Sequence, residues 1–114
     1  ANVQVFGQGV WGGGPQFRLI AHHWGRAKAV DKQTDFLSRA GEAALRDGAF
    51  REAATGFTEV LHLSRERFAD SPPQEERERR AHWEHQLGEA HFGLGDLPTA
   101  AEHLRASLAL RDRT

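Results

Sequence analysis

The 114-residue chain contains no cysteine. This absence excludes disulfide bonds, thiolate catalysis and cysteine-ligated metal sites. The chain also lacks an excess of either charge, since it has 15 Lys and Arg and 16 Asp and Glu. Nothing in this balance favours nucleic acid or an anionic membrane as a partner. No apolar run approaches the roughly 20 residues that span a bilayer, and the N-terminus has no signal-peptide pattern. We therefore expect a cytoplasmic protein with no nucleic-acid or membrane partner.

Methionine is absent as well, so residue 1 is not an initiating methionine. Unless that methionine was removed, we interpret the chain as a piece of a longer polypeptide. Its length fits one domain with a core of ordinary size. A large catalytic fold with its own cofactor domain is not expected in a chain this short.

Residues 1–16 are rich in glycine and contain the spacing G-x-G-x-x-G at positions 7–12, after a short alternating apolar run. A dinucleotide-binding loop with this spacing needs a helix at the third glycine and a second strand that ends in an acidic residue. Here more glycine and a proline follow, and the candidate acids Asp31 and Asp35 fall at or inside a predicted helix. We interpret residues 1–16 as a leader or linker and predict no cofactor.

Beyond residue 16 the chain is dominated by residues that favour helix, and no strand pattern is found. Gly48 and Gly95 are placed to end helices. Ser71 begins a Ser-x-x-Gln capping box with Gln74, and Asp96 is placed as the N-cap of the last helix. The sequence therefore predicts an all-α fold of about five helices, near residues 17–27, 31–47, 50–68, 72–94 and 97–111.

The chain repeats itself after 47 residues. Shifting it by this distance places residues 40–63 on residues 87–110, with eight identities among the 24 positions. The shared residues are small where helices approach, glycine where the chain turns, and leucine on the apolar seam. Each unit is therefore predicted to be a helical hairpin.

The pattern of these units resembles the tetratricopeptide repeat. In both units the resemblance is carried by apolar and small positions, although Ala44 and His91 stand where the family has an aromatic residue and the 47-residue shift exceeds the family's usual 34. The matching positions are Leu37, Ala40, Gly41, Ala44, Ala53, Phe57 and Val60, then Leu87, Gly88, His91, Ala100, Leu104 and Ser107.

The resemblance implies antiparallel hairpins stacked as a short solenoid. The expected organisation is a leader at 1–16 and a repeat domain at 17–114, made of a partial repeat 17–30, a repeat 31–68, a loop 69–73 and a repeat 74–111. More narrowly, "LIAHHWGRA" followed by "FLSRAGEAALRDGAFREAATGFTEVL" is similar to the helical region that follows the ATPase module in bacterial signalling proteins related to adenylate cyclases and in large transcriptional activators.

In tetratricopeptide arrays the first helix of each hairpin lines a concave groove that holds a peptide or a partner helix. Glu42 and Glu89 stand where some members use asparagine to bind a terminal carboxylate, so a partner with basic character is favoured. The alternative is that these side chains pack against the next repeat of a longer array. Carried over by position, the groove residues are Asp35, Ser38, Glu42, Leu45, Arg46, His82, His85, Glu89 and Phe92.

Other site patterns are weaker. His82, His85 and Glu89 lie on one helical face, but a fourth metal ligand is not found, and we predict no metal. No nucleophile, base and oxyanion donor are brought together by the pattern, so we expect no enzyme activity. In "QEERERR", residues 74–80, acidic residues precede basic ones by four positions, which favours a solvated helix face.

We therefore expect an interaction or scaffold module, part of a larger bacterial signalling or regulatory protein. The alternative is a structural repeat segment of an ATPase- or cyclase-linked regulator with no ligand of its own. No polar capping helix follows the last predicted helix. We therefore expect either a truncated array or an end-to-end homo-oligomer that covers this helix through Leu104, Leu108 and Leu110.

Overall fold

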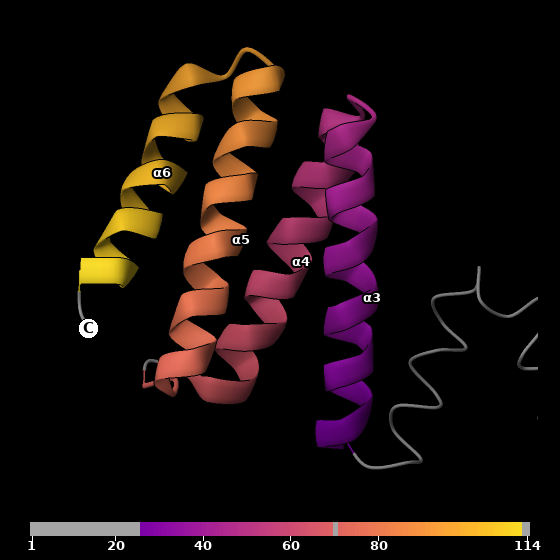
Figure 1. The fold of residues 1–114 in the computed structure, drawn as a ribbon, viewed down its shortest axis with the longest axis vertical. Helices are drawn as coiled ribbons and strands as arrows, with labels where there is room; N and C mark the ends of the chain where they lie inside the picture. Colours follow the sequence, from indigo (N-terminus) through magenta and orange to yellow (C-terminus); the bar gives the residue numbers. More distant parts are fainter. Residues whose placement is uncertain (1–25, 70, 113–114) are drawn as a thin grey trace, which may run out of the picture. The chain divides into compact units, whose positions relative to one another are not determined.

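The computed structural model describes residues 26–69 and 71–112, and these form four helices without a strand (Figure 1). They are α3 (Arg26–Arg46), α4 (Phe50–Phe68), α5 (Gln74–Gly93) and α6 (Leu97–Asp112). The predicted all-helical architecture is confirmed for this part of the chain. The glycine-rich segment 1–16 and nearly all of the predicted helix at 17–27 lie outside the described residues.

The start of α3 differs from the expected pattern. We predicted one helix that ends near Ala27 and another that begins near Asp31, whereas α3 runs without a break from Arg26 to Arg46. The reason is local, because residues 26–40 contain no glycine or proline that would interrupt a helix. The packing described below concerns the compact unit that begins at Thr34.

The two turns inside the hairpins have the same geometry. Gly48 and Gly95 have φ of +79° and +84°, in the left-handed region that favours glycine. The amides of Gly48 and Ala49 donate to carbonyls in the last turn of α3, and those of Gly95 and Asp96 do the same for α5. This is the hydrogen-bond pattern of a Schellman motif, and it confirms the role predicted for both glycines.

The predicted N-terminal caps have different outcomes. The Thr99 amide donates to the Asp96 carboxylate at 3.3 Å, as expected for an N-cap. Hydrogen bonds from Thr99 hold the pKa of Asp96 below its ordinary value, with a smaller contribution from His91. The capping box at Ser71 is wrong, because α5 begins two residues later than predicted, with Pro73 at the cap position and without a side-chain cap.

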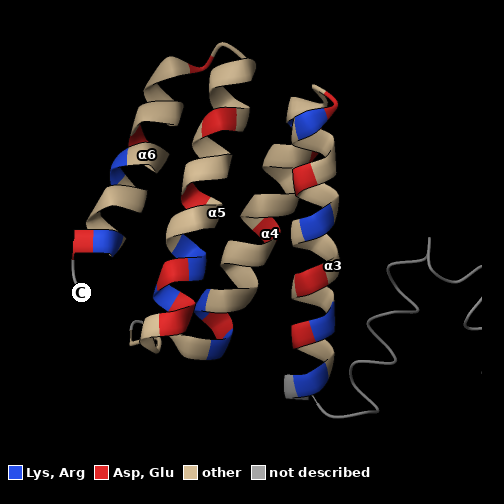
Figure 2. Cartoon of the chain, viewed as in Figure 1, with Lys and Arg blue, Asp and Glu red and all other residues tan. Residues whose placement is uncertain are grey.

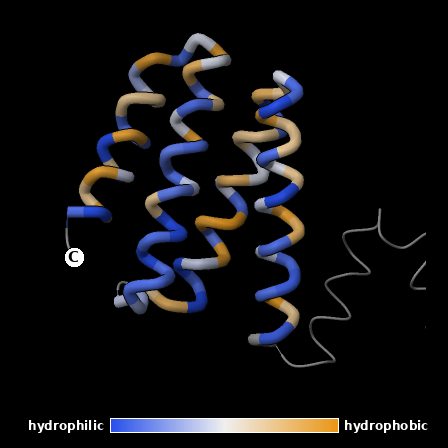
Figure 3. Tube along the Cα trace, in the orientation of Figure 1, coloured by the Kyte–Doolittle hydropathy of each residue, from blue (hydrophilic) through white to orange (hydrophobic). Residues whose placement is uncertain are grey.

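The core lies where α4 meets α5, and Leu37, Ala44 and Leu45 of α3 pack against it. Figure 3 shows the apolar positions of α4 along its length, between polar stretches on α3 and α5. Burying a large apolar side chain of this kind contributes about 1.5–3 kcal/mol. The buried cluster consists of Ala53, Phe57, Val60, Leu61, Trp83, Leu87 and Ala90.

The 47-residue repeat is visible in the packing of both hairpins. A Cβ added to Gly41 would lie 3.0 Å from the ring of Phe57, and one added to Gly88 would lie 2.9 Å from the side chain of Leu104. Both pairs are related by the same shift of 47. In each hairpin, therefore, a glycine in the first helix makes room for a large apolar side chain of the second.

The close approach gives a matched pair of substitutions. Gly41→Ala is expected to lower the free energy of unfolding by about 1–3 kcal/mol, because the new methyl group forces the buried ring of Phe57 to move. Gly56→Ala places its methyl group no closer than 3.5 Å to any neighbour. The higher helix propensity of alanine is expected to raise stability there by up to about 1 kcal/mol. Urea denaturation measures both values, and a stabilising Gly41→Ala would contradict the packing.

Candidate functional site

The groove residues predicted from the sequence fall on α3 and α5, at spacings of three and four that place each set on one side of its helix. The two helices approach where His82 Nε2 lies 3.8 Å from Glu42 Oε2. Both side chains are about half exposed, and His85, Glu89 and Phe92 are exposed on α5. We call the surface formed by Asp35, Ser38, Glu42, His82, His85, Glu89 and Phe92 the α3/α5 face.

The predicted groove residues on α3 differ in their surroundings. The Asp35 carboxylate pairs with Arg39 at 3.2 Å, and the backbone carbonyl of Asp35 accepts a hydrogen bond from the Ser38 hydroxyl. Arg46 is exposed in the last turn. Leu45 packs against the core, so it supports the α3/α5 face from below rather than presenting its side chain to a partner.

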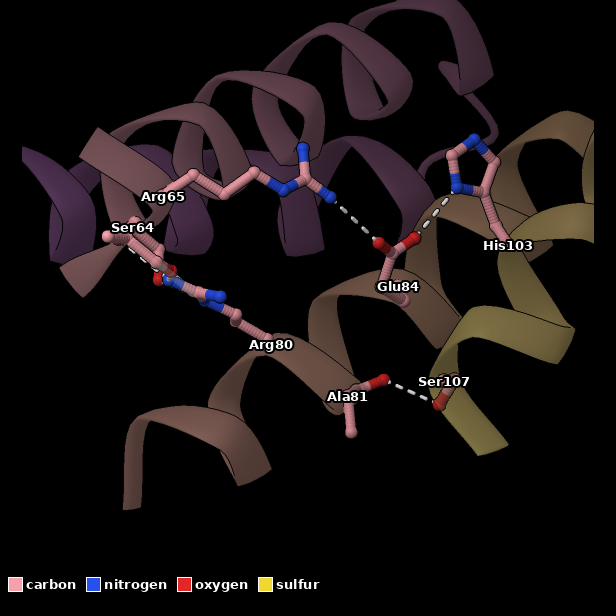
Figure 4. A network of polar contacts seen from close by, with 8 residues as sticks. Ser64, Arg65, Arg80, Ala81, Glu84, His103 and Ser107 are labelled. Atoms are coloured by element: carbon pink, nitrogen blue, oxygen red, sulfur yellow. Dashed lines mark hydrogen bonds and ion pairs between the residues drawn. The ribbon is translucent and has the colours of Figure 1, made fainter. Parts of the chain in front are cut away.

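A second group of polar side chains is buried between α4 and α5 (Figure 4). The Ser64 hydroxyl donates to Glu76 Oε2 at 2.6 Å and accepts from Arg80 Nε, also at 2.6 Å. Arg80 further donates to the carbonyls of Ser64 and Ala69, where α4 ends. Glu76 and Arg80 are only 5% and 7% exposed, so the solvated face predicted for residues 74–80 is wrong at these two positions.

Figure 2 shows why that interpretation failed, since basic and acidic residues, here Arg and Glu, are interspersed through the first turns of α5. A regular charge pattern does not reveal that one side of the helix faces α4. The sequence did contain one signal, because Ser64 falls on the apolar stripe of its own helix. A hydroxyl on a buried stripe needs polar partners, and the charged side chains of α5 supply them.

Glu84 is the centre of a further polar cluster. Its carboxylate is almost fully buried and accepts from Arg65 of α4 at 3.1 Å and from His103 of α6 at 2.7 Å (Figure 4). An ionised carboxylate only accepts hydrogen bonds, so the proton of His103 lies on Nδ1. Glu84 therefore connects three helices through one side chain. Sequence reasoning did not identify it, because its partners lie 19 residues away on either side.

The cluster continues to the ring of His91, which stacks on that of His103 with 5.4 Å between centroids. His91 Nδ1 is buried and makes no hydrogen bond among the described residues; the Asp96 carboxylate lies 3.9 Å away. Among residues 26–69 and 71–112, no three His, Asp or Glu side chains gather closely enough to hold a metal ion. The contacts of His103 in this cluster are a hydrogen bond and a ring stack.

Comparisons of the chain with protein-family models, curated proteins and solved structures found no match. The relation between the two hairpins therefore rests on the internal repeat and on its packing. No helix in the described part of the chain is long and apolar enough to cross a membrane.

The buried hydroxyl can be tested by substitution. Ser64→Ala is expected to lower the free energy of unfolding by about 1–3 kcal/mol, because buried Glu76 and Arg80 each lose a hydrogen-bond partner. Ser38→Ala removes a hydroxyl that, among the described residues, bonds to a carbonyl of its own helix, and is expected to change stability by less than about 0.5 kcal/mol. Equal effects in chemical denaturation would contradict the role assigned to Ser64.

Glu84 gives a separate prediction. Glu84→Ala is expected to cost about 2–4 kcal/mol, since it removes both hydrogen bonds and leaves a cavity. Arg65→Ala is expected to cost less than about 1 kcal/mol, because the arginine is 58% exposed and its ion pair is screened by solvent. Thermal and urea unfolding of both variants checks the order, and an Arg65→Ala effect as large as that of Glu84→Ala would contradict it.

Proposed function

We propose that this chain is a tetratricopeptide-like interaction module that binds a protein segment on the α3/α5 face and acts as a scaffold without chemistry of its own. The observation that carries the proposal is the approach of the first helices of two successive hairpins at Glu42 and His82. This approach supports a continuous surface made by both hairpins. A bound segment is then able to contact both repeats at once.

The charge of the α3/α5 face favours a basic segment. Asp35, Glu42 and Glu89 contribute three carboxylates. In the described part of the chain, Arg39 pairs with Asp35. Phe92, 67% exposed at the end of α5, adds an apolar contact. A segment that combines Lys or Arg with one large apolar side chain matches this combination.

The proposal is tested with the 114-residue chain as bait and an extract of a bacterial cell as the source of partners. Glu42→Arg combined with Glu89→Arg reverses the charge of the α3/α5 face on both helices. The variant is expected to capture about tenfold less, or still less, of the proteins that the parent chain captures, because its new arginines repel a basic partner.

The matched control is Glu52→Arg combined with Glu102→Arg, which makes the same change in net charge at exposed positions of α4 and α6. Capture by this variant is expected to stay at the parent level. Unchanged capture by the α3/α5 variant, or an equal loss in the control, would overturn the proposed binding face.

A further inference from the structure

Positions related by the 47-residue shift differ in burial on the second helix of each hairpin. Phe57 and Leu61 of α4 are 0% and 2% exposed, whereas the equivalent Leu104 and Leu108 of α6 are 37% and 61% exposed. The difference does not extend to every equivalent position, because Ala53 of α4 and the equivalent Ala100 of α6 are both buried. Leu104 and Leu108 thus leave an apolar surface, which we call the α6 end, at positions whose α4 equivalents belong to the core cluster shared with α5. Part of Leu104 packs against Gly88 of its own hairpin, and the rest of its side chain is exposed.

The first helices show the reverse difference. On α5, Trp83 and Leu87 are buried at 3% and 1% exposed in the cluster shared with α4. The equivalent residues of α3 are Phe36, which is 58% exposed, and Ala40, which is also exposed. Phe36 and Ala40 therefore form a second surface, the α3 end. It carries an aromatic and a smaller apolar side chain in the arrangement in which α5 offers Trp83 and Leu87 to α4.

We propose that copies of this chain associate head to tail, with the α3 end of one copy packed on the α6 end of the next. The contact between α4 and α5 within one chain is the template for this interface. Phe36 takes the place of Trp83, while Leu104 and Leu108 take the places of Phe57 and Leu61. The two surfaces are different, so the interface is heterologous, and a dimer retains one unused α3 end and one unused α6 end to which further copies can add.

The template also explains why a second copy, in this orientation, is the preferred occupant. Pairing of two α6 ends would bring leucine against leucine without an aromatic residue, and would leave Phe36 of both copies in solvent. The association is weaker than the contact inside the chain, because α6 has Arg111 where α4 has the Ser64 hydroxyl that bonds to Glu76 and Arg80. It is consequently expected to depend on protein concentration.

The test is light scattering on the 114-residue chain over about 10 μM to about 1 mM. The average mass of the parent chain is expected to rise with concentration beyond that of a monomer. Phe36→Asp and Leu108→Asp are each expected to remain monomeric, since each removes one end. Both positions are exposed in the structure, and circular dichroism checks that each variant keeps its helical content.

Mixing the two variants distinguishes the head-to-tail arrangement from any symmetric pairing. Phe36→Asp retains a normal α6 end and Leu108→Asp retains a normal α3 end, so an equimolar mixture is expected to form dimers and no larger species. Phe92→Asp is the matched control, because Phe92 is equally apolar and exposed but lies on the α3/α5 face. This control is expected to associate like the parent chain.

Three results would overturn the proposal: a parent chain that stays monomeric over the whole range, a Phe36→Asp variant that associates as the parent does, or a mixture that fails to form dimers. None of them bears on partner binding at the α3/α5 face, which is measured by capture and carried by other residues.

Discussion

The packing of α4 on α5 is the interaction on which the rest of this structure depends. Phe57 of α4 and Leu87 of α5 are essentially without solvent contact, and Trp83 is buried with them. These side chains join the hairpin formed by α3 and α4 to the hairpin formed by α5 and α6. Without this contact each hairpin would expose the apolar seam that it now buries, and a single helical hairpin has too small a core to be stable alone.

Buried polar groups then fix how the two hairpins meet. An apolar seam alone tolerates small shifts of one helix along another. The hydroxyl of Ser64, held between Glu76 and Arg80, and the carboxylate of Glu84, held between α4 and α6, satisfy their hydrogen bonds in one register only. Any other register would leave these charges buried without partners, which is costly.

The regular parts of the fold follow from local sequence. The limits of α4, the two turn glycines and the Asp96 cap depend on residues within one turn of each other, and all are as predicted. The repeat identified in the sequence also reappears as two equivalent contacts, Gly41 with Phe57 and Gly88 with Leu104. Small residues at these spacings are informative because they are needed where helices approach.

The errors arise where tertiary contacts decide. Ser71 has good capping chemistry, but α5 begins only at Gln74. Glu76 and Arg80 look like surface residues, yet α4 covers them because Ser64 needs polar partners. The α3/α5 face was predicted only in part. Helical spacing places its residues on one side of each helix, but the contact between Glu42 and His82 is seen only in the structure. What binds there is not encoded in the spacing.

Native-state hydrogen exchange tests most directly the central claim that α4 and α5 share one core. The account predicts that the slowest amides of both helices, around Val60 and Leu87, exchange with the same free energy of opening, because neither helix exposes its buried face without the other. That common value should equal the global free energy of unfolding from denaturation. Two separate values, with one hairpin opening while the other remains protected, would contradict the account.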